Sequence, residues 1–165
     1  MPNISHAVLI GARVAIIYDA LTTQQGLSAW WTPGTQAMPQ AGTIAHFPFG
    51  SGYFKEMSIR ELIPAETVKW DCVAGADEWV GTSLSFKLIP ANKQLLLQSY
   101  PEMTGQVEQQ EQETGTLLFF KHENWREETL MFAECSYTWA LFLRSLKLYC
   151  ETGKGRPWPL QHGLV

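Results

Sequence analysis

The stretch from residue 127 to 152 predicts one helix that runs the length of the molecule. Its start is marked by Glu127 and Glu128, because the helix dipole favours carboxylates in a first turn, and its end by Gly153. Such a helix is about 39 Å long, whereas a compact chain of this length has a radius of gyration of about 15 Å. A broad surface must therefore lie against it. Apolar residues recur on one face at intervals of three and four, which is typical of a helix packed on a core: Phe132, Cys135, Trp139, Phe142, Leu143, Leu146, Tyr149 and Cys150.

The composition indicates one globular domain spanning residues 1–165. The chain has 165 residues, of which 45% are hydrophobic, and no break in composition divides it. Its net charge of −4 is spread without a basic stripe, which argues against nucleic acid as a partner. No apolar run reaches the roughly 18 residues of a membrane span, and Arg13 interrupts the only run that resembles a signal peptide. We therefore expect a cytoplasmic protein without a membrane span.

Short apolar runs before the long helix predict antiparallel strands. Val68, Trp70 and Cys72 alternate with polar residues, which gives one strand an apolar face and a wet face. Glycine-rich and proline-containing breaks, among them residues 50–52, suit tight turns between strands. The predicted strands are 5–10, 43–49, 53–63, 66–73, 81–88 and 115–122, and two short helices over 13–21 and 22–31 follow the first strand.

The segment before the last strand has a weaker pattern. Residues 94–100 are compatible with a strand, and the polar run from 101 to 114 is typical of a mobile excursion. The tail after Gly153 contains Pro157, Trp158 and Pro159, so it cannot continue the helix and is expected on the surface over residues 155–165.

Four stretches of the chain resemble a known family. They read DALTTQQGLSAWW over 19–31, WVGTSLSFKLIP over 79–90, GTLLFFKHENW over 115–125 and ETGKG over 151–155. Together they resemble the activator of heat-shock-protein ATPase homologue family, within the START-like or SRPBCC superfamily. The resemblance implies an α+β helix-grip fold, in which a curved antiparallel sheet wraps around a long C-terminal helix. The chain departs from the family pattern at residues 95–114, which enlarge the last hairpin.

The resemblance also implies classes of function. Members of the superfamily bind lipids, polyketides, hormones or flavonoid-like molecules, some are aromatases or cyclases, and a few assist chaperones. We expect a small hydrophobic ligand between the sheet and the long helix, without a cofactor. Alternation and helical phase predict the residues that contact this ligand: Trp30, Trp31, Trp70, Phe86, Phe120, His122, Phe132, Cys135 and Trp139. The same large side chains are also those that would simply pack as a core.

The sequence is compatible with two roles for His122, a ligand contact or a structural residue of the core. Alternation turns it inward beside Phe120, where a neutral imidazole can donate to a ligand oxygen or relay a proton. Buried histidines are otherwise satisfied by the protein itself. An enzyme using this cavity, cyclase-like or hydrolase-like, would need an acidic partner, and Glu134 and Glu123 are the nearest in sequence. Helical phase places Glu134 away from Trp139, so the sequence favours a binding protein over an enzyme and over a co-chaperone.

The sequence contains no motif for a metal site or an activated nucleophile. The histidines have no cysteine or carboxylate at ligand spacing, and no nucleophile elbow, phosphate loop or dinucleotide fingerprint occurs. The three cysteines, Cys72, Cys135 and Cys150, are an odd number in apolar surroundings, which predicts reduced thiols and no disulfide.

A second apolar set lies on the opposite face of the long helix. It consists of Tyr137, Leu141 and Leu148. Either the C-terminal tail or the short helices cover it, or it is the contact surface of a homodimer.

Overall fold

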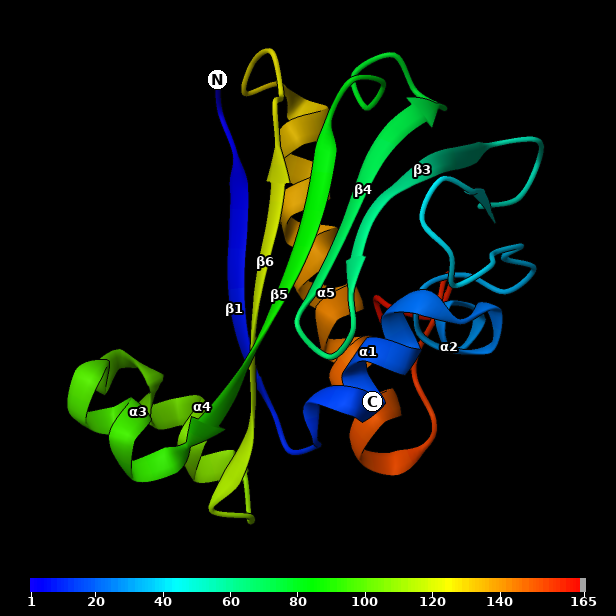
Figure 1. Cartoon of the computed structure of the whole chain (residues 1–165). Helices are drawn as coiled ribbons and strands as arrows, with labels where there is room; N and C mark the ends of the chain where they lie inside the picture. The colour runs from blue at the N-terminus through cyan, green and yellow to red at the C-terminus, as the bar shows by residue number, and fades with distance from the viewer. Residues whose placement is uncertain (164–165) are drawn as a thin grey trace.

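A computed structural model describes residues 1–163 and places six antiparallel strands in one curved sheet, with the long helix packed against its concave face (Figure 1). The strand order is β1-β6-β5-β4-β3-β2. The strands are β1 (Ile4–Ile10), β2 (Ile44–Pro48), β3 (Phe54–Ile63), β4 (Thr67–Ala74), β5 (Ser83–Asn92) and β6 (Thr114–Glu123). The helices are α1 (Val14–Thr22), α2 (Gln24–Trp30), α3 (Lys93–Ser99), α4 (Thr104–Gln109) and α5 (Leu130–Thr152), with a 3₁₀ turn η1 (Pro101–Met103). The predicted α+β helix-grip fold is confirmed.

The long helix α5 begins three residues later than the acidic pair predicted. The Thr129 hydroxyl accepts a hydrogen bond from the Phe132 amide at 3.2 Å, which makes Thr129 the N-cap. Glu127 and Glu128 therefore precede the helix, and the prediction that they form its first turn is wrong. The C-terminal prediction is confirmed, because Gly153 adopts φ 84° and its amide donates to Tyr149 at 2.8 Å.

Strand β3 bends along its length (Figure 1). Its pairing with β4 shifts register twice, between Glu56 and Met57 and between Ile59 and Glu61. Such irregularities bend a strand and increase its twist, which lets the sheet wrap around α5. On β5 and β6 the pairs Phe86–Phe120 and Leu84–His122 face inward together, as alternation predicts.

In the connection from β5 to β6, the structure differs from the strand predicted over residues 94–100. Residues 93–99 form helix α3 instead of a strand, because the Asn92 side chain accepts from the amides of Gln94 and Leu95 and caps it. The following polar run is also helical and is anchored to β1. The Gln106 side chain accepts from the Leu9 amide at 2.8 Å and donates to the Ala7 carbonyl at 3.1 Å.

The C-terminal tail returns over α2 and α5. The Arg156 amide donates to the Ser145 hydroxyl at 2.7 Å, and the Trp158 amide donates to the Trp31 carbonyl at 2.7 Å. Trp158 is half-buried, so the tail closes one end of the core as well as lying on the surface. The last two residues of the predicted tail, 164 and 165, lie outside the described residues. Within residues 1–163, no helix combines the length and the apolar character of a membrane span.

Candidate functional site

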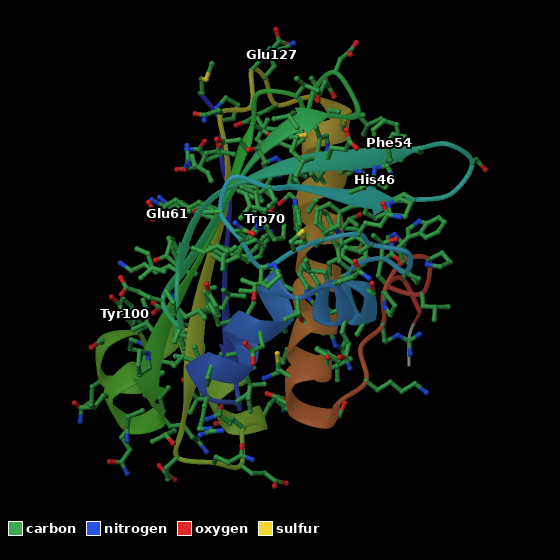
Figure 2. All side chains as sticks on the ribbon, turned by 45° about the vertical axis from the view of Figure 1, so that its right-hand side comes forward. His46, Phe54, Glu61, Trp70, Tyr100 and Glu127 are labelled. Atoms are coloured by element: carbon green, nitrogen blue, oxygen red, sulfur yellow. The ribbon has the colours of Figure 1, made fainter. Side chains whose placement is uncertain are left out.

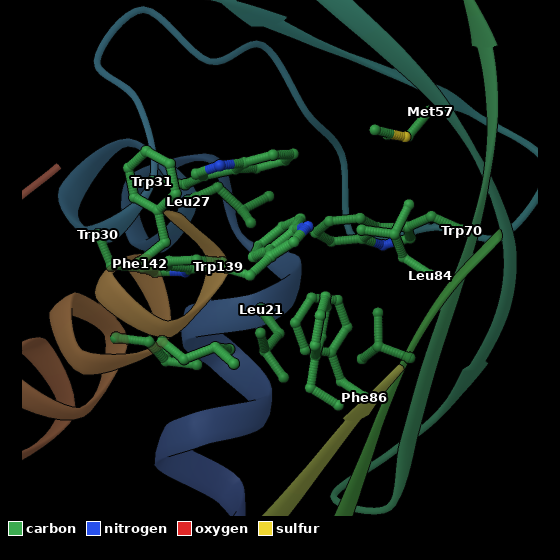
Figure 3. Close-up of a cluster of buried hydrophobic side chains, with 14 of the residues drawn as sticks. Leu21, Leu27, Trp30, Trp31, Met57, Trp70, Leu84, Phe86, Trp139 and Phe142 are labelled. Carbon is green, nitrogen blue, oxygen red and sulfur yellow. The ribbon is translucent and has the colours of Figure 1, made fainter. Parts of the chain in front are cut away.

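The centre of the molecule, between the sheet and α5, is filled with aromatic side chains (Figure 3). Trp31 stacks on Trp30 with ring centroids 5.9 Å apart and on Trp70 at 5.8 Å. Trp139 from α5 packs on Phe120 at 4.5 Å. The predicted ligand space is therefore not at this central position, because the side chains expected to line it occupy it themselves.

Open space remains at one end of the core, below the β2–β3 turn. This pocket has a volume of about 230 Å³. Its walls come from the β2–β3 turn, the β4–β5 loop, α5 and the C-terminal tail. It is lined by Trp31, Phe49, Tyr53, Lys55, Trp79, Glu134, Cys135, Thr138, Trp139, Phe142, Trp158 and Gln161.

Lys55 is the charged side chain buried in this pocket. On β3 it lies on the same face as buried Met57 and pairs across the sheet with buried Phe47, so it points inward, and only 7% of it is exposed. Its Nζ lies over three aromatic rings, at 4.3 Å from the centroid of Phe49 and 4.5 Å from those of Tyr53 and Trp79. Burial lowers the pKa of the Lys55 ammonium to about 8.

The other polar groups of the pocket differ in how well they are satisfied. The Cys135 thiol accepts from Trp79 Nε1 at 3.3 Å, and burial raises its pKa, so it packs as a neutral group. Gln161 is 9% exposed, and its buried Oε1 has no hydrogen-bond partner among the described residues. Glu134 lies at the rim and accepts from the Thr138 hydroxyl at 3.1 Å. Glu134 is exposed, as helical phase predicts, yet it borders the same pocket as buried Trp139.

His122 lies behind the pocket and is fully used by the protein. Trp139 Nε1 donates to His122 Nδ1 at 3.1 Å, so His122 Nε2 carries the proton and donates to the Thr82 hydroxyl at 2.8 Å. That hydroxyl donates in turn to the Trp79 carbonyl at 2.6 Å. The ring is 0% exposed, and desolvation lowers its pKa to about 3. His122 is thus a neutral, satisfied core residue in this structure.

The nine residues predicted to contact a ligand fall into two groups. Trp31, Cys135 and Trp139 line the pocket. The other six do not line it: Trp30, Trp70, Phe86, Phe120 and His122 are buried in the core, and half-buried Phe132 packs edge-on against Trp125.

Sequence reasoning missed the most unusual lining residue, Lys55. Alternation through Met57 and Ile59 places Lys55 on the inward face of β3, and a lysine at an inward position is the signal that could have found it. Trp158 and Gln161 carry no such signal, because the path of the tail depends on contacts distant in the sequence.

The face of α5 with Tyr137, Leu141 and Leu148 is only partly covered. Tyr137 is 62% exposed, and its ring lies 6.1 Å from that of His162 in the tail. Leu141 and Leu148 are half-buried. Leu148 also borders a groove between β1, α4 and α5, beside Arg144 and Lys147.

Within residues 1–163 the structure contains no group of three or more His, Cys, Asp or Glu side chains that could hold a metal ion. All three cysteines are free.

Comparisons with known proteins relate the whole chain to one family. The solution structure of the Aha1 dimer from Colwellia psychrerythraea is 35% identical, with a TM-score of 0.74, and the match covers 94% of this chain and 100% of that one. Protein MLL2253 from Mesorhizobium loti is 14% identical, with a TM-score of 0.70 over 91% of this chain and 97% of that one. CalU16 from Micromonospora echinospora is 16% identical, with a TM-score of 0.63 over 92% of this chain and 75% of that one. The similarities to MLL2253 and CalU16 show the fold alone. No curated protein sequence gave a significant match. The profile of Activator of Hsp90 ATPase homolog 1-like proteins matches residues 12–151, and the chain belongs to this family.

Proposed function

We propose that the protein binds a small, mainly apolar molecule in the pocket below the β2–β3 turn. The observation that carries this proposal is the composition of the walls, to which four tryptophans contribute around a volume of about 230 Å³: Trp31, Trp79, Trp139 and Trp158. Ligand sites are typically concave, apolar and provided with a few polar groups, and their volumes run from about 300 to 1,000 Å³. A volume below this range favours a guest of few rings or a short chain.

Binding is favoured over catalysis by the state of the groups that would perform a reaction. His122, the predicted acid or base, has both ring nitrogens hydrogen-bonded and a pKa of about 3, so it is not available to move a proton near neutral pH. Glu123 lies on the surface near Lys121, with 3.8 Å between the charged atoms. A cyclase-like or hydrolase-like mechanism through these residues therefore lacks support.

The experiment fills the pocket from α5. Thr138→Phe places a ring in the space, whereas Ala133→Phe adds the same ring at an exposed position of the same helix. Binding of a neutral two-ring ketone, 2-acetylnaphthalene, is followed by quenching of tryptophan fluorescence and by calorimetry. We expect Thr138→Phe to abolish binding and Ala133→Phe to leave it intact. Equal binding of the ketone to both variants would contradict the proposal, as would a wild-type protein that binds neither this ketone nor its carboxylate analogue, 2-naphthoate.

We also propose that the protein forms a homodimer through Tyr137, Leu141 and Leu148. Support comes from the exposure of Tyr137 and from the 35% identical Colwellia protein, whose structure is described as a dimer. Sedimentation equilibrium tests this proposal. Tyr137→Asp is expected to give a monomer, whereas Leu95→Asp, which changes an exposed residue of α3, leaves a dimer. A monomeric wild-type protein at high concentration would rule the interface out.

The free state of all three cysteines supports a cytoplasmic location, which we likewise propose.

A further inference from the structure

The strongest unexplained feature of the molecule is the buried ammonium of Lys55. Three other lysines form ion pairs although their side chains are 23% to 40% exposed. Lys55 is far more buried and forms no ion pair with the residues that the structure describes. A buried cation without an anion is costly, so such groups are normally paired. The three paired lysines are Lys69 with Glu61, Lys121 with Glu123 and Lys147 with Glu151.

The aromatic rings around Lys55 hold the ammonium in place but do not neutralise it. Phe49, Tyr53 and Trp79 contribute the negative faces of their rings, and the pocket space lies beside the same three side chains. The ammonium is thus held at the wall of a cavity that is otherwise mainly apolar. An anionic atom placed in that cavity would find a desolvated, positioned positive charge.

The other titratable groups near Lys55 do not supply a buried counter-ion. Cys72 on β4 and Cys135 on α5 have thiol pKa values raised by burial, that of Cys72 to about 11. His122 on β6 is neutral, and the pKa of the Tyr53 phenol is also raised by burial. Glu134 carries a charge, but it is exposed at the rim and accepts from Thr138.

We propose that the guest of this pocket carries an acidic oxygen, as in a carboxylate or phenolate, and that Lys55 is its counter-ion. The apolar body of the guest packs on the tryptophans, and the unpartnered Gln161 Oε1, which is an acceptor, is left for an O–H or N–H donor elsewhere on the guest. This inference rests on the proposed binding function and narrows its ligand class to weakly acidic aromatic or lipidic molecules.

Two isosteric probes separate this inference from the binding function itself. 2-Naphthoate is anionic at pH 7, whereas 2-acetylnaphthalene has the same ring system and a similar shape without the charge. The wild-type protein is expected to bind the carboxylate about tenfold to a hundredfold more tightly, as for a hydrogen bond between charged groups. Equal affinity for both probes would overturn the inference and leave the binding function standing. Failure of both probes to bind would overturn the two proposals together.

Lys55→Met is the decisive variant, because methionine has a similar length and no charge. We expect the carboxylate-to-ketone preference to collapse to about equal affinity. Lys69→Met is the matched control, because it removes the same charge from the solvent face of the neighbouring strand, and it is expected to keep the preference. A preference that survives Lys55→Met, or an equal loss of both probes in a folded variant, would assign Lys55 a packing role and overturn the inference.

Lys55→Arg keeps the test valid if the methionine variant does not fold. An arginine stays protonated at high pH, whereas the Lys55 ammonium of the free protein has a pKa of about 8. In the wild-type protein, affinity for 2-naphthoate is expected to fall by up to about tenfold per pH unit above that value, while affinity for the ketone stays flat. Lys55→Arg should remove this pH dependence. A carboxylate affinity that is flat between pH 7 and 10 in the wild-type protein would contradict the inference.

Discussion

His122 and Lys55 both lie on the inward face of the sheet, yet the protein treats these two basic side chains differently. His122 is 0% exposed, donates to Thr82 and accepts from Trp139. Lys55 is 7% exposed, stays in contact with aromatic rings and faces about 230 Å³ of open space. Both ring nitrogens of His122 are therefore already hydrogen-bonded, whereas the ammonium of Lys55 has no counter-ion among the described residues and remains available to a ligand.

The difference arises over a short distance, because the ring of Trp79 lies against both the imidazole of His122 and the ammonium of Lys55. Around His122 the rings of Trp79 and Trp125 lie 4.5 Å and 4.7 Å from the imidazole and exclude any guest. In Figure 2, His46 and Phe54 lie on the β2–β3 pair, and Tyr100 lies at the opposite end of the molecule. Phe49 and Tyr53, from the turn that joins β2 and β3, line the pocket. A polar group is informative about function where its hydrogen-bonding capacity and a cavity coincide.

The largest expected effect tests whether His122 is purely structural. His122→Phe keeps an aromatic ring but leaves Trp139 Nε1 without an acceptor, and a buried unsatisfied group costs about 1 to 3 kcal/mol. It also removes the hydrogen bond to the Thr82 hydroxyl, which keeps only its bond to the Trp79 carbonyl. We expect the free energy of unfolding, measured in urea, to fall by about 2 to 4 kcal/mol. His46→Phe, which removes a half-exposed contact to Glu56, serves as the control and should cost less than about 1 kcal/mol.

Acid titration sharpens the same test. The pKa of His122 is about 3 in the folded protein, below its ordinary value, so the unfolded chain binds the extra proton as pH falls from about 6.5 toward 3. The wild-type protein should therefore lose stability across this window. His122→Phe lacks this component of the pH dependence, and an unchanged slope in the variant would show that His122 is not buried in the neutral form.

The second effect has the opposite sign, because Lys55 weakens the fold. Lys55→Met should raise the free energy of unfolding at pH 7 by about 1 to 3 kcal/mol, since it removes a buried cation without a counter-ion. The folded pKa of about 8 lies below the ordinary lysine value, so wild-type stability rises between pH 8 and about 10.5 and the gap to the variant shrinks. Lys69→Met should show neither change. A destabilised Lys55→Met variant would mean that the ring contacts outweigh the cost of burial.

Periodic patterns explain what could be predicted from the sequence. The core face of α5 and the inward set through Trp70, Phe86 and Phe120 follow from periods of 3.6 and 2, because burial on one face imposes them. The segment Leu95–Leu97 lacks a diagnostic period, and the side chain of Asn92 decides for a helix.

The pocket escaped prediction because its walls meet only in three dimensions. The pairing of Phe47 with Lys55 brings together two strands, and the register of a strand pair is set by contacts that no single strand's pattern gives. Trp158 joins the wall because the tail is bound to Ser145 and Trp31, and no local pattern encodes those contacts. Central aromatic residues were predicted as ligand contacts for the opposite reason: an inward side chain fills a core as readily as it lines a cavity.

A smaller effect is expected where the tail is attached. The buried Ser145 hydroxyl donates to the Trp30 carbonyl and accepts from the Arg156 amide, both at 2.7 Å. Ser145→Ala should cost about 1 to 2 kcal/mol of stability and weaken ketone binding about twofold to tenfold, because Trp158 loses its support. Thr152→Ala, at the exposed end of the same helix, should leave binding unchanged. Unchanged binding in Ser145→Ala would mean that the tail is not needed as a wall of the pocket.

The smallest effect concerns the rim carboxylate and tests whether Lys55 awaits an external anion. If Glu134 were the true partner of Lys55 in solution, Glu134→Gln would free the ammonium and increase the carboxylate-to-ketone preference by about tenfold or more. Because Glu134 is exposed and accepts from Thr138, we expect an increase of less than about threefold that disappears in high salt. Calorimetry with both probes at low and high ionic strength distinguishes these cases. A small, screened effect means that the charge of Lys55 is left for the guest, whereas a large one would make the lysine as fully satisfied by the protein as His122.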